Sequence, residues 1–406
     1  MVRLQNTNMS AQKLCRLWAA LIIPLAAVPL PAQPAGVSTN SSNRVFTKDG
    51  LPVDTNFFPM AVWCQSPANA RRFQAAGINL YVALWEGPTA AQLQELQSAH
   101  MPVICSLNQL ALRFKDNPII AGWMHEDEPD NAQSLGSGQG YGPPILPATI
   151  VKNYQRMRSM DPSRPVMVNL GQGVAWDDWI GRGVRSHHPE DYPEYIQGCD
   201  IASFDIYPAV HDSPQVAGKL EFVARGAERL ASWTRGQKPF WCAIECTHID
   251  NPNVKPTPQQ VRSEVWMALI GGARGLIYFV HQFKPVFREA ALLDDPEMMA
   301  SVTEINRQIR ELAPVLNSPT VAGRLTVAST NAGARMATMV KYNEGVTCVF
   351  AVNLANQPAH AAFTFLDPNH GRQAEVLGEA RHIPVPGQNF ADDFAPYAVH
   401  LYKLAP

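Results

Sequence analysis

Eight short apolar runs alternate along the chain with segments whose hydrophobic residues recur at helical spacing, and this alternation limits the possible folds more than any other feature. Such a pattern is typical of parallel βα units, in which a helix covers each strand. Eight units close most economically as a (β/α)₈ barrel, so we expect the α/β class. The predicted strands are 57–63, 78–85, 102–107, 119–127, 165–170, 200–207, 239–245 and 275–281, and the main predicted helices are 89–100, 148–160, 218–235, 257–272 and 296–316.

A second pattern begins after Asn317-Ser318-Pro319, where polar and apolar residues alternate in short runs. Alternation with a period of two is typical of strands that are buried on one face. The runs are 325–328, 334–342, 346–353, 360–365, 374–377 and 398–404. We therefore predict a barrel domain over 36–318 and a small β-sandwich over 319–406, which a chain of 406 residues with 46% hydrophobic residues can accommodate.

The amino-terminal segment 1–35 resembles a secretory signal peptide. Lys13 and Arg16 precede the apolar run 17–30, and small residues and prolines follow it. The run is too short and too often interrupted by proline for a membrane span, which needs about 20 apolar residues. We expect an exported protein, secreted or periplasmic. Without residues 1–35 it would carry 30 basic and 35 acidic residues, a net charge of −5, which argues against a nucleic acid partner.

Neither a metal ion nor a cofactor is expected. Six of the seven cysteines follow the signal segment, and none of them has the Cys-x-x-Cys spacing of a structural zinc site. Export would permit disulfides, but Cys105, Cys242 and Cys348 lie in predicted strands, where a buried thiol is more common. Their pairing and the oligomeric state stay open. The adjacent His187 and His188 are poorly spaced to share one metal ion.

Carboxylates mark the ends of two predicted strands. The run 119–127 leads into Glu126, Asp127 and Glu128, and the run 239–245 contains a single acid, Glu245. In a barrel the carboxyl ends of the strands converge on one face. Hydrolysis of a glycosidic bond needs one carboxylic acid to protonate the leaving oxygen, and one carboxylate to attack the anomeric carbon or activate water. We therefore predict Glu128 as general acid/base and Glu245 as nucleophile.

Alternatives remain for both glutamates. The acids around Glu128 are also what a solvated turn would contain, and Glu126 competes because it is in phase with Glu128 along an ideal strand. Glu245 has the alternative of pairing with Arg262 or Arg274. A structural role without a partner would be costly for an acid in an apolar strand.

Other residues are candidates for substrate binding. Sugar rings stack on aromatic side chains, and Trp63 and Trp85 are best placed by strand position, although tryptophan is also a common core residue. Asp205 and Tyr207 share a strand phase, so both either enter the pocket or form a polar pair inside the barrel. Further aromatic candidates are Trp123, Tyr141 and Trp176, and the glycine-rich loop 130–147 is a candidate wall or lid of the cleft.

The strand motifs resemble those of a known group. Gly122-Trp123 followed by Asp127-Glu128-Pro129 resembles the Gly-Trp and Asn-Glu-Pro signature on strand four of the retaining barrel glycosidases, the clan A glycoside hydrolases. Glu245 fits their strand-seven nucleophile, and 204–208 and 274–279 are similar to their strands six and eight. The resemblance implies a carbohydrate substrate, β-glucan being favoured, and retention through a covalent glycosyl-enzyme.

Two departures from this group keep other functions open. Asp127 replaces the usual asparagine, and strand eight ends in Val280-His281-Gln282, where many members have tryptophan; His281 would then bond a sugar hydroxyl or pack. A non-catalytic carbohydrate-binding protein on a degenerate barrel is the main alternative. A metal-dependent hydrolase would need clustered histidines at strand ends, where only His125 and His281 are found.

Overall fold

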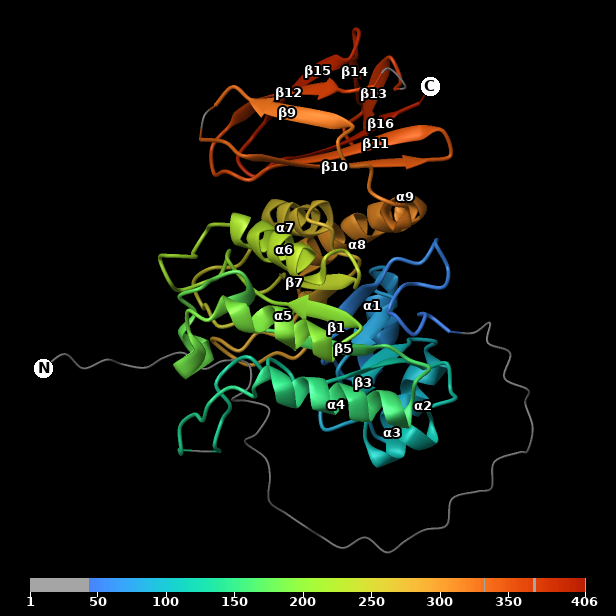
Figure 1. Ribbon diagram of the computed structural model, residues 1–406, viewed down its shortest axis with the longest axis vertical. Coiled ribbons are helices and arrows are strands. Elements are labelled where there is room, and N and C mark those ends of the chain that lie inside the picture. The colour runs from blue at the N-terminus through green and yellow to red at the C-terminus, as the bar shows by residue number, and fades with distance from the viewer. Residues whose placement is uncertain (1–43, 137, 332, 368–369, 406) are drawn as a thin grey trace, which may run out of the picture.

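The computed structural model describes residues 44–136, 138–331, 333–367 and 370–405, and it confirms a (β/α)₈ barrel followed by a β-sandwich (Figure 1). The predicted signal segment 1–35 lies outside the described residues. Among the described residues, no helix has the length and apolar character needed to cross a bilayer. None of the six cysteines described forms a disulfide, and five of them are buried.

The barrel consists of eight parallel strands in sequence order, and β8 pairs with β1 to close it. Each strand is shorter than predicted, because the residues at its ends already turn into loops. The strands are β1 (Met60–Trp63), β2 (Leu80–Val82), β3 (Val103–Ser106), β4 (Ile120–Met124), β5 (Val166–Leu170), β6 (Ile201–Phe204), β7 (Phe240–Glu245) and β8 (Leu276–Phe279).

Helices surround the barrel, and their ends follow local sequence signals. Thr257 caps α7 in a capping box with Gln260, and Pro258 stands in the first turn, as predicted. The predicted helix 296–316 is two helices, because α8 ends before Leu312 and Pro314 stands in the first turn of the next. The helices are α1 (Ala70–Ala75), α2 (Ala90–Ser98), α3 (Gln109–Arg113), α4 (Pro147–Met160), α5 (Tyr192–Tyr195), α6 (Glu221–Thr234), α7 (Pro258–Ile270), α8 (Pro296–Glu311) and α9 (Ala313–Asn317).

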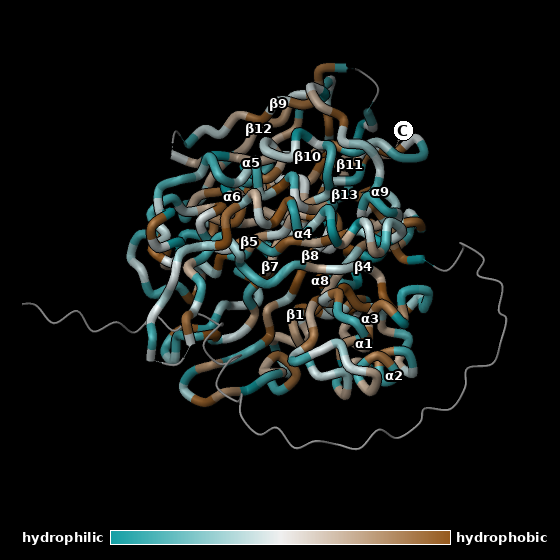
Figure 2. Tube along the Cα trace, turned by 60° about the horizontal axis from the view of Figure 1, so that its bottom comes forward, coloured by the Kyte–Doolittle hydropathy of each residue, from teal (hydrophilic) through white to brown (hydrophobic). Residues whose placement is uncertain are grey.

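Two apolar layers hold the barrel together. Inward side chains such as Leu80, Met167, Trp241 and Ile277 fill its interior, and the outward side chains of the strands pack against the helices. Hydrophobic segments recur along the strands and helices in Figure 2, whereas many outer loops are hydrophilic. A filled interior leaves the ends of the barrel as the place for a binding site.

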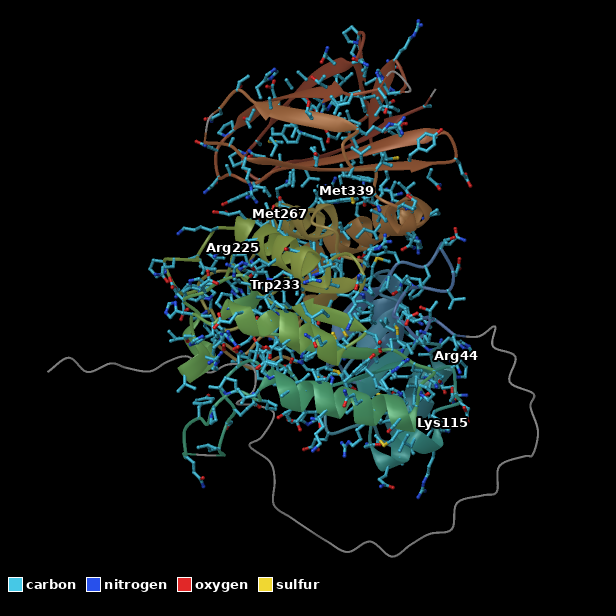
Figure 3. The ribbon with its side chains drawn as sticks, in the orientation of Figure 1. Arg44, Lys115, Arg225, Trp233, Met267 and Met339 are labelled. Carbon is cyan, nitrogen blue, oxygen red and sulfur yellow. The ribbon has the colours of Figure 1, made fainter. Side chains whose placement is uncertain are left out.

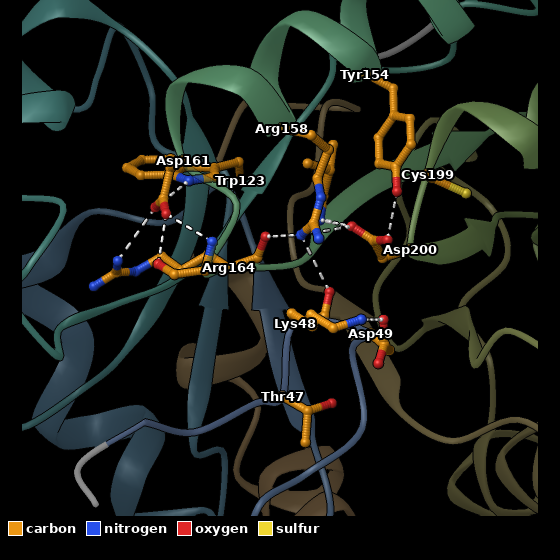
Figure 4. A network of polar contacts seen from close by, with 12 residues as sticks. Thr47, Lys48, Asp49, Trp123, Tyr154, Arg158, Asp161, Arg164, Cys199 and Asp200 are labelled. Carbon is orange, nitrogen blue, oxygen red and sulfur yellow. Dashed lines mark hydrogen bonds and ion pairs between the residues drawn. The ribbon is translucent and has the colours of Figure 1, made fainter. Parts of the chain in front are cut away.

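A polar network closes the amino-terminal end of strands β4 to β6 (Figure 4). Asp161 accepts a hydrogen bond from Nε1 of Trp123, at 2.9 Å, and pairs with Arg164. Asp200 accepts from the amide of Val166 and from the Tyr154 hydroxyl. These contacts bind α4 to three strands, so we assign this face to stability.

The carboxyl-terminal domain consists of two antiparallel sheets. One has the order β10-β11-β16-β13-β14 and the other β15-β12-β9. Strands β14 and β15 lie outside the predicted runs, because their short polar sequences lack a clear apolar alternation. The strands are β9 (Leu325–Ser329), β10 (Met336–Asn343), β11 (Val346–Asn353), β12 (Ala359–Phe365), β13 (Gln373–Val376), β14 (Arg381–Pro384), β15 (Asn389–Phe394) and β16 (Val399–Leu404).

The sandwich packs on α7 of the barrel domain. Trp266 of α7 stacks on Phe350 of β11, with ring centroids 5.4 Å apart, and Ser263 donates a hydrogen bond to the carbonyl of Tyr397. Met267 on α7 and Met339 on β10 lie on opposite sides of this boundary in Figure 3, and both are buried. The two domains therefore share a continuous apolar interface.

Candidate active site

A cavity of about 490 Å³ opens at the carboxyl ends of the barrel strands. This volume is in the range of small-molecule sites. Residues at or just beyond the ends of the strands form its floor and inner wall: Trp63, Asp127, Glu128, Asn169, Asp205, Tyr207, Ala243, Ile277 and Phe279. Loop residues form the rim, among them Gln172, Trp179, His211, Asp212, Asp250 and Lys284.

Glu128 reaches this cavity through an unusual backbone conformation. Its φ is +42°, in the left-handed region that residues with a side chain seldom adopt. Its amide donates to the carbonyl of Asn169 at 3.1 Å, and its carbonyl accepts from the amide of Asn131 at 3.1 Å. Strain of this kind is found at functional sites, where neighbouring structure holds it in place. The turn after β4 therefore directs one particular carboxyl group at the cavity.

A buried layer behind Glu128 fixes this turn. Asp130 is fully buried, and it accepts hydrogen bonds from the amide of Gly171 at 2.9 Å and from the Tyr192 hydroxyl at 3.0 Å. Arg182 donates to the carbonyl of Asp130 and pairs with Asp191. Gly171 is needed for close approach, since a Cβ there would lie 2.8 Å from Oε1 of Glu128.

Glu128 and Asp205 line the same cavity. Burial, and then the negative charge of Asp205, raise the pKa of Glu128 well above its usual value. Burial, and then the negative charge of Asp127, raise the pKa of Asp205 in the same direction. Two buried carboxyl groups at one site do not readily ionise together, so the pair favours retention of a proton.

Asp127 lines the cavity beside this pair. Burial raises its pKa to about 6, and the amide nitrogen of Asn169 donates to its Oδ1 at 3.0 Å. Asn169 is itself fixed by the hydroxyl of Ser203, at 2.7 Å. Position 127 therefore carries an acid in place of the expected asparagine, and the side-chain amide beside it comes from Asn169 of β5.

Glu245 occupies a different environment. It is fully buried at the end of β7, and it is not among the residues that line the cavity. Its two carboxylate oxygens accept hydrogen bonds from the amides of Ala209, at 2.6 Å, and Val210, at 3.0 Å. Burial raises its pKa to about 7, and a hydrogen bond with Glu264 of α7 opposes this rise.

The arginines considered as partners of Glu245 have other contacts. Arg262 donates to Gln308, and Arg274 donates to the carbonyl of Leu316. Glu245 is instead held by the backbone amides of Ala209 and Val210, partners that the sequence did not suggest.

The aromatic candidates divide into lining and non-lining residues. Trp63 lines the cavity. Trp85 and Tyr141 are 38% and 45% exposed and lie off its wall. Trp123 is buried against the helices through its bond to Asp161, and Trp176 packs on Trp179 and His211. Among these predicted platforms, Trp63 alone is a lining residue of the described cavity.

Three other predicted site features do not line the cavity. Glu126 is exposed and does not line the cavity, so Glu128 is the acid of the turn that the cavity contains. His281 is buried, contacts Gln65 at 3.2 Å and stacks on Phe283, while burial lowers its pKa to about 4. No described residue of the loop 130–147 lines the cavity.

Several lining residues were not predicted from the sequence, among them Asn169, Gln172, Trp179 and His211. Asn169 could have been identified from the sequence, because it is the only polar residue of the buried strand β5. The others lie on loops, where periodicity gives no guide.

The described residues contain no group of three or more histidine, cysteine or acidic side chains arranged to hold a metal ion. His125, which the metal-dependent alternative required, places its ring nitrogen 2.7 Å from the carbonyl of Gly198. His281 lies against Gln65 and the phenylalanines, so the two histidines do not form a shared site.

Comparison with known proteins identifies solved structures that share the fold. No family model matches the chain, and no curated protein matches its sequence. Among solved structures, a GH42 β-galactosidase from G. stearothermophilus is 8% identical, with a TM-score of 0.51 over 90% of this chain and 100% of that one. A provisionally assigned α-galactosidase from Bacteroides fragilis is also 8% identical, with a TM-score of 0.53 over 87% of this chain and 81% of that one. At this identity the likeness establishes the shared fold.

Proposed function

We propose that this chain is a glycoside hydrolase in which Glu128 is the general acid/base. The observation that carries the proposal is the position of two buried acids, Glu128 and Asp205, on the wall of one cavity. A carboxyl group that keeps its proton near neutral pH is what protonation of a glycosidic oxygen requires. An adjacent carboxylate supports the positive charge that develops at the anomeric carbon.

The composition of the cavity wall supports a sugar as the ligand. Trp63, Trp179 and Tyr207 offer aromatic surface for the apolar faces of a pyranose ring. Asn169 and Gln172 offer amide groups for its hydroxyls. Two solved neighbours with TM-scores above 0.5 bear galactosidase names, so galactosides belong among the first substrates to test.

The finer part of the proposal comes from the sequence. It is an exported enzyme that cleaves β-glycosidic bonds of a poly- or oligosaccharide with retention, β-glucan being the favoured substrate. The resemblance to clan A assigns Glu245 as the nucleophile.

One observation favours the alternative of a non-catalytic carbohydrate-binding protein. Both oxygens of Glu245 are engaged by backbone amides, and Glu245 is absent from the cavity wall. A barrel without a second reactive carboxylate would bind sugars and leave them intact.

The test is turnover of a panel of β-glucans, xylans, mannans and aryl β-glucosides, β-galactosides and β-xylosides by the purified protein, with the product anomer followed by NMR. We expect cleavage with initial retention of configuration in the wild type and its loss in Glu128→Gln. Binding of a panel glycan without cleavage would replace the proposal with the binding function.

A further inference from the structure

We infer that Asp205, rather than Glu245, is the carboxylate that attacks the anomeric carbon. The inference rests on the proposed glycosidase function and departs from the nucleophile that the sequence resemblance assigns. It is drawn from the positions of the two acids relative to the cavity and to Glu128.

Asp205 has the exposure and the free oxygen that a nucleophile needs. It follows β6 directly, lines the cavity and is 9% exposed. Its Oδ2 accepts a hydrogen bond from the Tyr207 hydroxyl at 3.3 Å. Its Oδ1 receives no hydrogen bond from an N–H or hydroxyl group of the described residues. A buried carboxylate oxygen without a donor is costly, and a reactive site is one reason to retain it.

Glu245 lacks both properties. Each of its oxygens accepts a hydrogen bond from a backbone amide of the loop after β6, and the residue is not on the cavity wall. Attack on a sugar would require Glu245 to abandon two hydrogen bonds inside a fully buried environment. We assign Glu245 to holding the loop that follows Asp205 and Tyr207.

The resemblance to retaining glycosidases favours direct attack by Asp205 over activation of a water molecule. Inverting enzymes separate their carboxyl groups by roughly 6.5–9.5 Å to leave room for water, whereas retaining enzymes keep them about 5–5.5 Å apart. Glu128 and Asp205 line the same cavity, so both carboxyl groups can face one sugar. The configuration of the product distinguishes direct attack from activation of water.

The reaction then takes two displacements. A carboxylate oxygen of Asp205 forms an ester bond to the anomeric carbon as the glycosidic C–O bond breaks, and the Glu128 proton passes to the leaving oxygen. In the second step Glu128, now a carboxylate, takes a proton from water. The water oxygen bonds to the anomeric carbon and displaces the Asp205 carboxylate. Tyr207 is a positioning residue, because its hydroxyl orients one oxygen of Asp205 and leaves the other free.

Trapping of the covalent intermediate tests this assignment on the wild-type protein. The probes are 2-fluoro aryl β-glucosides, β-galactosides and β-xylosides, whose glycosyl-enzymes hydrolyse slowly. Trypsin separates the three candidate acids into different peptides: 116–152 with Glu128, 186–219 with Asp205 and 236–262 with Glu245. We expect a stoichiometric mass increase in peptide 186–219 that fragmentation locates on Asp205.

The other outcomes distinguish the inference from the proposed function. A label on Glu245 overturns the inference and leaves the glycosidase proposal intact. Turnover with inversion, without any label, does the same. Absence of both turnover and label, with panel glycans still bound, overturns both.

Variants give an independent check. Asp205→Ala should lose turnover by roughly 10⁴-fold or more. Added azide should attack the anomeric carbon and restore release of the phenol, with the sugar recovered as a glycosyl azide of inverted configuration. The Glu245→Gln variant should still be labelled on Asp205 and should still turn over substrate, but its melting temperature should be lower than that of the wild type. Azide rescue with inversion in Glu245→Ala, and none in a folded Asp205→Ala, would overturn the inference.

Discussion

The acids Glu128 and Asp205 line one cavity from positions just beyond the ends of β4 and β6. Burial raises the pKa of both carboxyl groups well above the usual value. Asp127 and Asp130 surround the pair and raise the pKa of Glu128 further by their charges. An acid that stays protonated in this setting is the basis of the first prediction.

Glu128→Gln should lower kcat toward an unactivated glycoside by roughly 10³-fold, because an amide cannot supply the proton to the leaving oxygen. The matched control is Glu126→Gln, two residues earlier, which is exposed and off the cavity wall and should leave kcat unchanged. Steady-state kinetics on both variants provide the measurement. Equal losses in the two variants would contradict the assignment of Glu128.

Gly171→Ala should reduce kcat by roughly 10²-fold while the protein stays folded. The new Cβ would lie 2.8 Å from Oε1 of Glu128 and 2.7 Å from Nδ2 of Asn131, so the carboxyl group has to move. Gly142→Ala is the control, because its nearest neighbour is a methyl group of Leu135 at 3.1 Å, far from the catalytic pair. An unchanged kcat in Gly171→Ala would show that the position of Glu128 is not critical.

Trp63→Ala should raise KM for the preferred glycoside about tenfold, which corresponds to about 1.4 kcal/mol of lost stacking. Trp63 lines the cavity, whereas Trp85 lies off its wall and is 38% exposed. Trp85→Ala should therefore leave KM unchanged. A larger effect at Trp85 than at Trp63 would place the sugar outside the described cavity.

The buried acids Glu245 and Glu264 should make the folded state less stable as pH rises. Burial raises the pKa of Glu245 from 4.5 to about 7, and raises that of Glu264 well above 4.5. A carboxyl group with a raised pKa binds its proton more tightly in the folded state. The unfolding free energy is therefore highest below the unfolded pKa near 4.5, and falls as pH rises through about 7.

Glu264→Gln should flatten this pH dependence, because one of the two buried titrations disappears. Urea unfolding between pH 4.5 and 8 measures the slope, and the exposed Glu194→Gln serves as control with the wild-type slope. A slope in Glu264→Gln as steep as in the wild type would contradict the coupling of the two acids.

Trp266→Ala should lower the unfolding free energy by about 3–5 kcal/mol, because it removes a fully buried ring that stacks on Phe350. Leu366→Ala, in the sandwich and 57% exposed, should change it by less than about 0.5 kcal/mol. Differential scanning calorimetry of the two variants is the measurement. A loss confined to one domain would show that the interface does not link their stabilities.

The barrel could be predicted from sequence because each strand is an apolar run of recognisable length. All eight strands fall within the predicted ranges, and the Thr257 cap of α7 follows from local residue chemistry. Strands β14 and β15 could not be found in this way, since Arg381–Pro384 and Asn389–Phe394 are short and polar. Both are defined by backbone pairing instead: β14 pairs with the preceding strand β13, and β15 pairs with β12.

The site was less predictable than the fold. The strand phase predicted that Asp205 and Tyr207 project to the same side, and both line the cavity. The acids at the end of the fourth predicted strand pointed to Glu128, which lines it as well. The strand phase could not reveal that the amides of Ala209 and Val210 donate hydrogen bonds to Glu245, because these contacts depend on the path of a loop. Nor could it find Trp179 and His211, which loops bring to the rim.

Helix α7 has buried residues on every side, from Val261 through Ile270 apart from Arg262, because one face covers β7 and the other supports the sandwich. An ordinary barrel helix keeps one face for water. Recombination therefore could not exchange this sandwich freely among barrels. Any chimera that joins this barrel to a foreign partner has to redesign α7 as well, and ancestral changes on either side of that helix would have had to be compatible with both cores.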